Sequence, residues 1–234
     1  MFTTVSDTIL RMKRRPTREL LDDDQGTPAE IAASLRDLRW FNRWFGGIAT
    51  TRGLFEGTAT ETKRNRFTVL EVGSGDGFLV RTVAGELGPG LQLDVTLLDR
   101  AASHLPVNGS MRKVAGDALR LPFRDSSFDL VSCSLFLHHL SPQQAVAFAR
   151  EGLRVSRTAV LVHDLIRDPV HFAFAYAGRP LYRSRITRHD APASVRQAYT
   201  TFEVAHFFRQ AGAADIQAQR RFFYRMGIVA RKTQ

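Results

Sequence analysis

The chain of 234 residues contains one cysteine, Cys133, and no long apolar run. A lone cysteine excludes a disulfide framework within the chain and a zinc site built from several cysteines, and its apolar surroundings favour a small core side chain. No run approaches the roughly 18 apolar residues of a membrane-spanning helix, and the N-terminus is too acidic and polar for a secretory signal. We therefore expect one globular domain in a soluble, cytoplasmic protein with no membrane span.

Lysine is also scarce, because only four of the 33 basic residues are lysines, although the net charge is +10. A positive net charge makes nucleic acid a candidate partner. The basic clusters are small, at residues 12–15 and 219–221, and none alternates with aromatic residues as in a platform for single-stranded nucleic acid. This distribution favours a generally basic surface, and no nucleic acid is expected. The sequence leaves open whether two copies form a homodimer.

Residues 1–65 are predicted to form a helical lid segment. Thr27-Pro28-Ala29-Glu30 is typical of a helix start, with a threonine cap, proline at the first helical position and glutamate completing a capping box. Apolar residues then recur at helical spacing until Gly46-Gly47 ends the pattern: Ile31, Leu35, Leu38, Phe41, Trp44 and Phe45. This stripe either packs on the main domain or closes over a ligand cleft.

Residues 66–234 alternate between strand and helix. Short apolar strands are predicted at 67–72, 91–98, 111–115, 128–133 and 159–163, and helices at 78–87, 142–155 and 204–211. The alternation predicts an α/β fold with a Rossmann-like, doubly wound, mostly parallel seven-stranded sheet. Two further strand-like runs within 214–231 are separated by little more than a turn, which predicts an antiparallel C-terminal hairpin at the sheet edge.

A glycine-rich loop, Glu71-Val72-Gly73-Ser74-Gly75-Asp76-Gly77, joins the first strand of this domain to its helix. Glycines let the backbone approach a ligand closely, and in an open parallel sheet this loop lies at the crevice that binds nucleotides. The spacing Gly-x-Gly-x-Gly, preceded by an acid, differs from that of dinucleotide-binding loops and disfavours hydride-transfer enzymes. Taken alone, the loop could equally be a tight turn.

Two more acids follow predicted strands at the same crevice. Asp99 ends the second strand, where a carboxylate can accept both hydroxyls of a ribose. Asp117 follows Gly116 after the third strand, in position to accept a hydrogen bond from an adenine amine. Each acid alone could be a surface residue, but their placement after successive strands indicates a nucleoside site.

Four stretches resemble the class I S-adenosylmethionine-dependent methyltransferases: VLEVGSGDGFL, VTLLDR, VAGDALRLPFRDSSFDLVSCSLFLHHL and the tail that begins EVAHFFRQAG. The resemblance spans roughly residues 66 to 231 and implies a methyltransferase whose cofactor is S-adenosyl-L-methionine. It implies the following cofactor-binding residues: Glu71, Gly73, Ser74, Gly75, Gly77, Asp99, Arg100, Gly116, Asp117, Ala118, Ser134 and Leu135. It says little about the acceptor, because this fold serves oxygen, nitrogen, carbon and sulfur nucleophiles.

Methyl transfer to a hydroxyl needs alignment and the removal of a proton, for which histidine is the natural base. His138 and His139 follow the fourth predicted strand and Asp164 follows the fifth, so a His-Asp pair is expected to form. This arrangement resembles natural-product sugar and phenol O-methyltransferases. Related quinone-pathway enzymes carry glutamate at the positions of Leu135 and His138, so no metal is predicted. The alternative is that these histidines have no part in the chemistry.

A long connection at about 165–201 is predicted to be an insertion that shapes acceptor binding. It carries five aromatic residues, Phe172, Phe174, Tyr176, Tyr182 and Tyr199, and its polar run 183–190 either meets an acceptor or is a solvated turn. The helix LRDLRWFNRWFGG and the run RSRITRHD resemble a subgroup of small bacterial methyltransferases associated with phenolic or polyketide products of secondary metabolism. A planar aromatic or polyketide acceptor would suit aromatic surroundings.

The sequence thus predicts O-methylation of a phenolic or polyketide-type small molecule. An RNA or protein methyltransferase is a rival that the basic surface favours, although the chain has no Asn-Pro-Pro-Tyr-type motif and no appended RNA-binding module. A non-catalytic protein that binds S-adenosylmethionine and acts through a partner is a second rival. Retention of every expected cofactor acid argues against it.

Overall fold

The computed structural model describes residues 12–22, 25–107 and 109–233. A seven-stranded sheet forms its centre, in the order β3-β2-β1-β4-β5-β7-β6. Strands β1 to β5 pair in parallel, and β7 pairs antiparallel with both β5 and β6: β1 (Arg66–Val72), β2 (Gln92–Asp99), β3 (Arg112–Ala115), β4 (Phe128–Ser134), β5 (Ser156–Leu165), β6 (Asp215–Arg221) and β7 (Arg225–Arg231). The predicted Rossmann-like sheet with its antiparallel hairpin is confirmed. Its strand order reverses between β1 and β4, which is where such sheets bind ligands.

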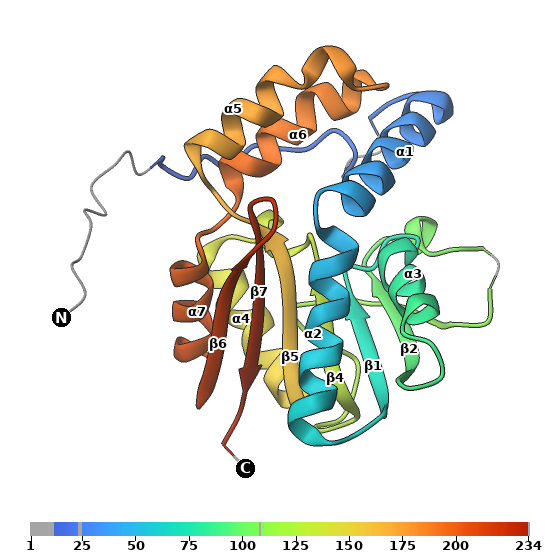
Figure 1. Ribbon diagram of the computed structural model, residues 1–234, viewed down its shortest axis with the longest axis vertical. Helices are drawn as coiled ribbons and strands as arrows, with labels where there is room; N and C mark the ends of the chain where they lie inside the picture. Colours follow the sequence, from blue (N-terminus) through green and yellow to red (C-terminus); the bar gives the residue numbers. More distant parts are fainter. Residues whose placement is uncertain (1–11, 23–24, 108, 234) are drawn as a thin grey trace.

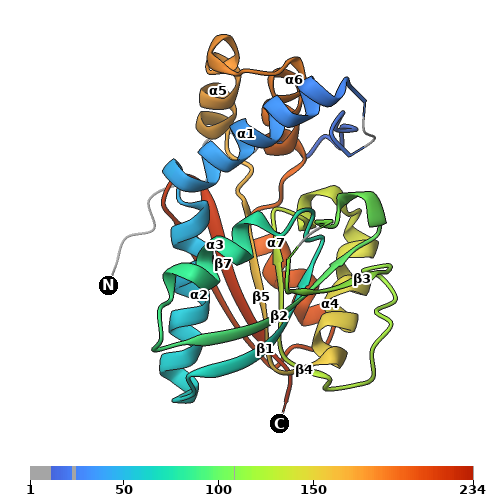
Figure 2. The same cartoon turned by 90° about the vertical axis from the view of Figure 1, so that its right-hand side faces the viewer.

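Helices cover both faces of the sheet (Figures 1 and 2). On one face lie α2 (Gly47–Thr62) and α3 (Phe78–Glu86), and on the other α4 (Pro142–Val155) and α7 (Thr201–Gln210). Because side chains alternate along a strand, each face has its own apolar core. Phe55, Val69 and Leu130 belong to the core under α2, whereas Val72, Cys133 and Phe148 belong to the core under α4. The buried position of Cys133 agrees with its interpretation as a core side chain.

Helix α2 is an element that the sequence analysis missed. Its sequence, GIATTRGLFEGTATET, is rich in glycine and threonine, which have low helix propensity, and its large apolar side chains are few. It is stable here because Leu54, Phe55 and Ile48 are buried against the sheet. The described residues among the first 65 are therefore divided between this layer and a second group of elements that includes α1.

That second group forms a cap beyond the carboxyl ends of the parallel strands (Figures 1 and 2). It consists of α1 (Pro28–Trp44), α5 (Pro169–Ala177) and α6 (Arg185–Gln197), with the short 3-10 turn η3 (Arg179–Leu181) between the last two. Two other 3-10 turns, η1 (Ala102–His104) and η2 (Leu137–His139), lie elsewhere in the fold. The predicted capping box of α1 is present between Thr27 and Glu30. The insertion after β5 is thus helical and joins the N-terminal helix above the sheet.

The apolar stripe of α1 is only partly buried. Phe41 and Phe45 are half-buried in an aromatic group with Trp40, whereas Trp44 is 64% exposed. The residues of α1 that are buried are mostly small or polar, and Asp37 among them accepts hydrogen bonds from Arg183. The cap is consequently held by polar contacts as much as by apolar packing.

The polar run 183–190 is neither a turn nor free in solvent. Ser184 caps α6 by accepting a hydrogen bond from the amide of Ile186, and Arg185 pairs with Glu30 at 2.6 Å. Asp190 accepts hydrogen bonds from the amides of Leu20 and Leu21. The run therefore fastens α6 to α1 and to the N-terminal segment.

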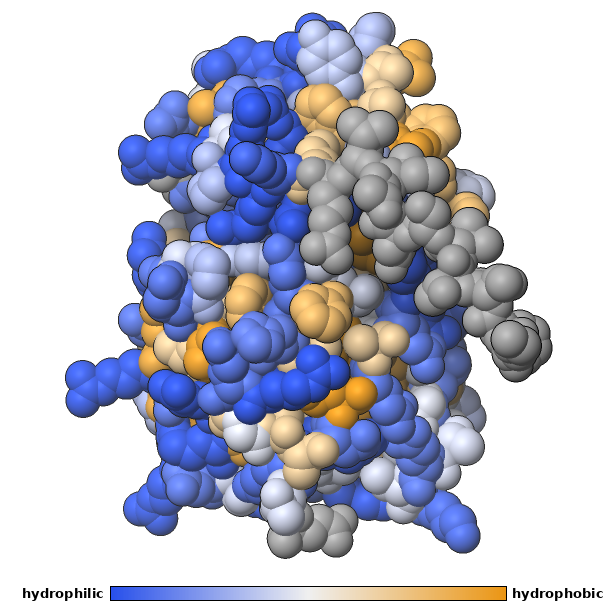
Figure 3. All heavy atoms as spheres, turned by 90° about the vertical axis from the view of Figure 1, so that its left-hand side faces the viewer, coloured by the Kyte–Doolittle hydropathy of each residue, from blue (hydrophilic) through white to orange (hydrophobic). Residues whose placement is uncertain are grey.

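One side of the molecule is mainly hydrophilic, with apolar side chains at the cap and also lower down over the sheet domain (Figure 3). Val170, Phe174 and Tyr176 of α5 are each about half exposed. Among the helices formed by described residues, none combines the length and the apolar character needed to cross a membrane.

Candidate active site

The glycine loop between β1 and α3 adopts a conformation that requires glycine at three positions. Gly73, Gly75 and Gly77 all have φ between 50° and 69°, in the left-handed region. A Cβ on Gly73 would lie 2.4 Å from the Phe136 ring, whereas a Cβ on Gly75 would meet nothing within 4 Å. The loop thus turns tightly under Phe136 and leaves open space above Gly75, on the side where a cofactor is expected.

Asp99 at the end of β2 is tied to this loop. Its Oδ2 accepts a hydrogen bond from the amide of Gly75 at 2.9 Å, and its Oδ1 accepts one from the amide of Ala101 at 3.0 Å. Each carboxylate oxygen can accept more than one hydrogen bond, so Asp99 retains capacity for ribose hydroxyls. The loop and Asp99 therefore form one unit at the switch point of the sheet.

The predicted adenine contacts lie next to this unit. Gly116 donates its amide to the carbonyl of Asp99, which joins the end of β3 to the end of β2. Asp117 is exposed and accepts a hydrogen bond from the amide of Leu119, while Ala118 is buried. Arg100 is exposed beside Asp99.

Glu71 is a buried carboxyl group at the base of the glycine loop. Burial raises its pKa to about 7, although the hydroxyls of Ser132 and Ser134 oppose the shift. Neither Glu71 Oε2 nor Ser134 Oγ has a hydrogen-bond partner among the described residues. Buried polar atoms are seldom left unpaired. Both residues lie at strand ends beside the glycine loop, and a ligand with an ammonium group would satisfy Glu71.

Leu135, directly after β4, has φ of 55°, which is uncommon for a side chain of this kind. Its amide donates to the carbonyl of His163 at the end of β5 and holds the turn in place. The glycine loop, Asp99, the unpaired Glu71 and Ser134 together fit S-adenosylmethionine, the cofactor that the resemblance implies.

The expected His-Asp pair forms with His138. Its Nδ1 lies 2.6 Å from Asp164 Oδ1, and its amide donates to Asp164 Oδ2 at 3.1 Å. Both side chains are buried. Burial alone would lower the pKa of His138, but the carboxylates of Asp164 and Glu19 outweigh it and raise the pKa to about 10. In this conformation the imidazole is therefore protonated at neutral pH.

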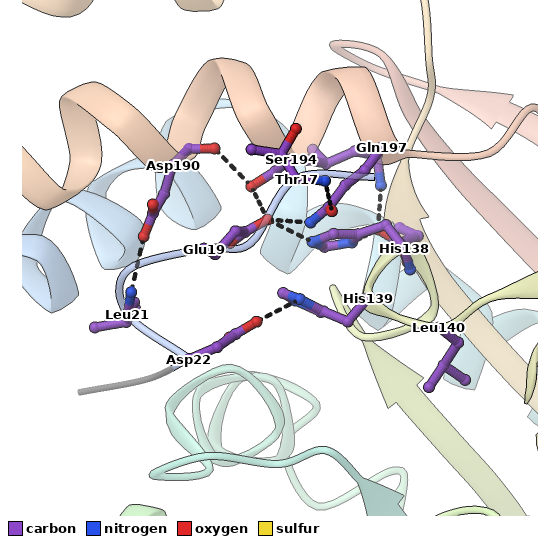
Figure 4. Close-up of polar contacts among 12 residues, drawn as sticks. Thr17, Glu19, Leu21, Asp22, His138, His139, Leu140, Asp190, Ser194 and Gln197 are labelled. Atoms are coloured by element: carbon purple, nitrogen blue, oxygen red, sulfur yellow. Dashed lines mark hydrogen bonds and ion pairs between the residues drawn. The ribbon is translucent and has the colours of Figure 1, made fainter. Parts of the chain in front are cut away.

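His139 takes a different partner. Its Nδ1 lies 2.8 Å from Asp22 Oδ2, and its ring lies 4.1 Å from that of His138 (Figure 4). Asp164 is thus the partner of only one of the two histidines. His139 is also more accessible, with 24% of its side chain exposed.

Glu19 closes the site from above (Figure 4). Its Oε1 lies 3.6 Å from His138 Nε2 and accepts hydrogen bonds from Ser194 and Gln197 of α6. Glu19 and Asp22 belong to residues 12–22, which we call the strap. The strap therefore covers the one ring nitrogen of His138 that Asp164 leaves available.

The strap is fastened at several points. Arg14 donates to the carbonyls of His138, Leu140 and Gln197, and its guanidinium lies over the ring of Tyr199. The amide of Thr17 donates to Gln197, as those of Leu20 and Leu21 do to Asp190. These bonds tie the strap both to α6 of the cap and to η2 of the site.

Glu19, His138 and His139 each place one potential metal-ligand atom within 4.8 Å of the others. Both histidines have a carboxylate at Nδ1, Asp164 and Asp22 respectively, as metal-binding histidines commonly do. The sequence prediction of no metal considered only the residues after β4, and it stays a prediction.

Sequence reasoning missed Glu19, Asp22 and the buried pair His163 and Arg225. The acids Glu19 and Asp22, separated by two leucines, were a signal, but nothing local linked them to histidines far along the chain. His163 precedes Asp164 and was taken as the end of a strand. Arg225 begins β7 and was not distinguished from the other arginines.

Known proteins to which this chain is similar are methyltransferases. A family described as the methyltransferase domain matches residues 70–160. The demethylmenaquinone methyltransferase of Roseiflexus sp. (strain RS-1) is 35% identical over an alignment of 167 residues that covers 63% of this chain and 68% of that protein. The demethylmenaquinone methyltransferase of Beutenbergia cavernae is 59% identical over only 44 residues, 19% of this chain and 18% of that protein.

Human N-acetylserotonin methyltransferase, solved in complex with SAM, has a similar structure. It superposes with a TM-score of 0.61 at 16% identity, over 93% of this chain and 63% of that protein. The chain thus spans less than two thirds of this structure and of the Beutenbergia protein. At this identity the likeness concerns the fold alone.

Proposed function

Because the chain belongs to the class I S-adenosylmethionine-dependent methyltransferases, we propose that it methylates an oxygen atom of a planar small molecule, a phenolic hydroxyl of a polyketide-type product. The observation that carries the proposal is the buried pair of His138 and Asp164 at the strand ends, close to the cofactor site. A hydroxyl acceptor needs a base, and this pair has the geometry of one.

The cofactor supplies an activated methyl group on its sulfonium when it is bound. We assign its ammonium group to Glu71, its ribose to Asp99 and its adenine edge to Asp117 and Ala118. The glycine loop brings the backbone close enough for these contacts. This assignment uses the unpaired carboxyl of Glu71 and the open space above Gly75.

His138 would take the acceptor's proton at Nε2, while Nδ1 keeps its own proton and donates it in a hydrogen bond to Asp164. The bound cofactor would supply the methyl group to the acceptor oxygen, and Nε2 of His138 would hold the proton that the acceptor loses. Asp164 fixes the ring and stabilises the imidazolium.

The strap must move for this to happen. Glu19 lies 3.6 Å from the nitrogen that would accept the proton and, after Asp164, contributes to the raised pKa of His138. Withdrawal of its negative charge lowers the pKa of His138 toward neutrality, where a base is effective. We therefore assign the strap, α1 and the insertion of α5 and α6 to a lid that opens for the acceptor.

A ring carbon is the second candidate acceptor atom. It is favoured by the 35% identical relative, whose name gives a quinone-type molecule as its acceptor. Such a ring has oxygen substituents beside the carbon, so the same base could activate either atom. The Roseiflexus protein makes carbon transfer a real competitor of oxygen transfer.

The test is turnover of a panel of phenols and quinols with S-adenosylmethionine that carries a 13C methyl group. The carbon chemical shift of the product distinguishes an O-methyl from a C-methyl group. We expect His138→Gln and Asp164→Asn to lower kcat/KM by about 10²–10⁴-fold while the affinity for S-adenosylhomocysteine is kept. His139→Gln is tested beside them, because His139 is the other candidate base. Full activity and an unaltered pH profile in all three variants would remove these residues from the mechanism.

A further inference from the structure

Five buried side-chain atoms in the described part of the chain lack any hydrogen-bond partner. They are Asn42 Oδ1, Glu71 Oε2, Ser134 Oγ, His163 Nε2 and Arg225 Nη1. Since buried polar atoms are nearly always paired, each exception calls for an explanation. The cofactor accounts for Glu71 and Ser134. The other three belong to a part of the site that the proposed chemistry has not used.

Strand register places these atoms on one face of the sheet. Glu71 is paired with Ser132, Ser134 with His163, and Leu165 with Arg225. Paired residues, and residues two apart on a strand, point to the same face. Glu71, Ser134, His163 and Arg225 therefore form a row across β1, β4, β5 and β7, on the face covered by α2. Asn42 lies above this row, near the joint between α1 and α2.

Arg225 is the member of the row whose burial without a charged partner costs the most free energy. It is 4% exposed, and its Nε donates to the carbonyl of Phe45 at 3.1 Å. It forms no ion pair with any carboxylate that the structure describes. Asp164 acts on it only at longer range and is already bonded to His138. A buried charge is costly unless it is paired, so a guanidinium in this state is a site for an anion.

His163 adds a second polar group beside Arg225. Its Nδ1 shares a hydrogen bond with the Thr51 hydroxyl at 3.1 Å, which leaves Nε2 without a partner. Burial, followed by the charge of Arg225, lowers the pKa of His163 to about 3, so the ring is neutral. A neutral imidazole can donate one hydrogen bond to an oxygen without a second positive charge.

We propose that Arg225 and His163 form a binding site for an anionic oxygen, a carboxylate or phenolate, of a ligand held beneath the cap. Arg225 would supply the charge and His163 one further hydrogen bond.

The acceptor is the source of this oxygen that the arrangement favours, and that identification rests on the proposed function. The cofactor site is built on β1, β2 and β4, and Glu71 gives it a negative charge on the methionine side. Arg225 lies two strands beyond β4, on the far side of β5. Asp164 lies near the carboxyl end of β5 and His138 lies beside it in η2, so an acceptor that spans this strand end would place a hydroxyl at His138 and an anionic group at Arg225. The other source of the same chemistry is the methionine carboxylate of the cofactor.

The test compares the full-length protein with Arg225→Met, and with Arg221→Met as a matched control. Arg221 is the exposed cross-strand partner of Arg225 in the same hairpin. Binding of 4-hydroxybenzoate and of 4-hydroxybenzamide is measured by calorimetry with saturating S-adenosylhomocysteine. We expect the wild type and Arg221→Met to prefer the benzoate, and Arg225→Met to bind it at least about tenfold more weakly with no change for the benzamide.

A second arm identifies the source of the oxygen. If the cofactor carboxylate occupies the site, Arg225→Met weakens S-adenosylhomocysteine but not 5′-methylthioadenosine, which lacks the amino acid part. Arg225→Lys keeps the charge and should retain part of the anion preference. We expect the Tm of Arg225→Met to be at least that of the wild type, because an unpaired buried charge is removed.

The proposal is overturned if Arg225→Met binds both 4-hydroxybenzoate and S-adenosylhomocysteine as the wild type does, or if it loses stability and Arg225→Lys shows no anion preference. These measurements need no turnover. A failure of the anion site is therefore distinguishable from a failure of the proposed methyl transfer.

Discussion

Glu71 combines burial, a missing partner and a pKa raised to about 7 by burial. A proton and the ammonium group of a cofactor compete for the same carboxyl, so acid should weaken cofactor binding. We predict that the affinity for S-adenosylhomocysteine falls up to about tenfold for each pH unit below 7 and is nearly constant above it. Calorimetry at pH 6, 7 and 8 measures this dependence.

The matched variant for that prediction is Glu71→Gln, which keeps the shape of the side chain and removes its titration. It should bind S-adenosylhomocysteine more weakly and with little dependence on pH in the same range. If Glu71→Gln retains the wild-type pH dependence, a different group is responsible and the assignment of Glu71 to the ammonium group is wrong.

The role of a single residue could be predicted wherever the sequence immediately around it indicated that role. Glu71 and Asp99 each end an apolar strand, and His138 and Asp164 each follow one, so parallel strands were enough to predict that they meet. Glu19 had no such local context. Its place over His138 depends on how the strap docks on α6, a contact between distant residues that no periodicity encodes.

The strap is the element whose position decides access to His138. Arg14 fastens it through hydrogen bonds to three backbone carbonyls. We predict that Arg14→Ala lowers the free energy of unfolding by about 1–3 kcal/mol, since several hydrogen bonds to a partly buried cation are lost. The amides of Leu20 and Leu21, now bonded to Asp190, should exchange with solvent faster. Hydrogen exchange read by mass spectrometry checks this.

Lys13→Ala is the control, because Lys13 is the exposed neighbour of Arg14 in the same strap. It should leave the exchange of Leu20 and Leu21 unchanged. Equal exchange in the wild type and Arg14→Ala would mean that Asp190 and Gln197 hold the strap without Arg14.

Among whole elements, those with a strong pattern were predicted well. Helix α4 begins and ends where its proline and amphipathic spacing indicate, and the strands lie close to their apolar runs. Helix α2 was missed because glycine and threonine hide its helical tendency, which tertiary burial of Phe55 and Leu54 overrides. The insertion after β5 was read as a binding feature but not as two helices, since its aromatic residues suit several structures.

At the scale of the whole molecule, the buried titratable groups near the carboxyl ends of the strands are of two kinds. His138 and Asp164 form a charged pair, whereas His163 and the more peripheral His171 are buried as neutral rings. Burial lowers the pKa of His171 to about 4, against the hydrogen bond to the Ile166 carbonyl. The two kinds of histidine therefore respond to pH in opposite directions.

The sign for each group follows from its pKa in the folded chain. For His163 and His171 the folded pKa is below the unfolded value near 6.5, so their contribution is present above pH 6.5 and is lost as the pH falls. For His138 the folded pKa is about 10, so its contribution is present below pH 6.5 and is lost toward pH 10. The pKa of Glu71 is raised to about 7 in the folded chain, so protonation of Glu71 stabilises the fold as the pH falls from 7 to 4.5. This gain partly offsets the loss of stability that the neutral histidines cause.

We predict that the free energy of unfolding falls between pH 6.5 and pH 4, and that His171 alone accounts for about 2–3 kcal/mol of this fall. Denaturant unfolding at several pH values measures it. His171→Asn removes the titration and can still donate a hydrogen bond near the Ile166 carbonyl, so its stability should be lower at pH 7 but should decline less steeply toward pH 4. Parallel pH curves for the wild type and His171→Asn would show that this ring is not held neutral. The loss of stability at acidic pH would then have to arise from His163 or from the carboxylates that form ion pairs and hydrogen bonds in the cap.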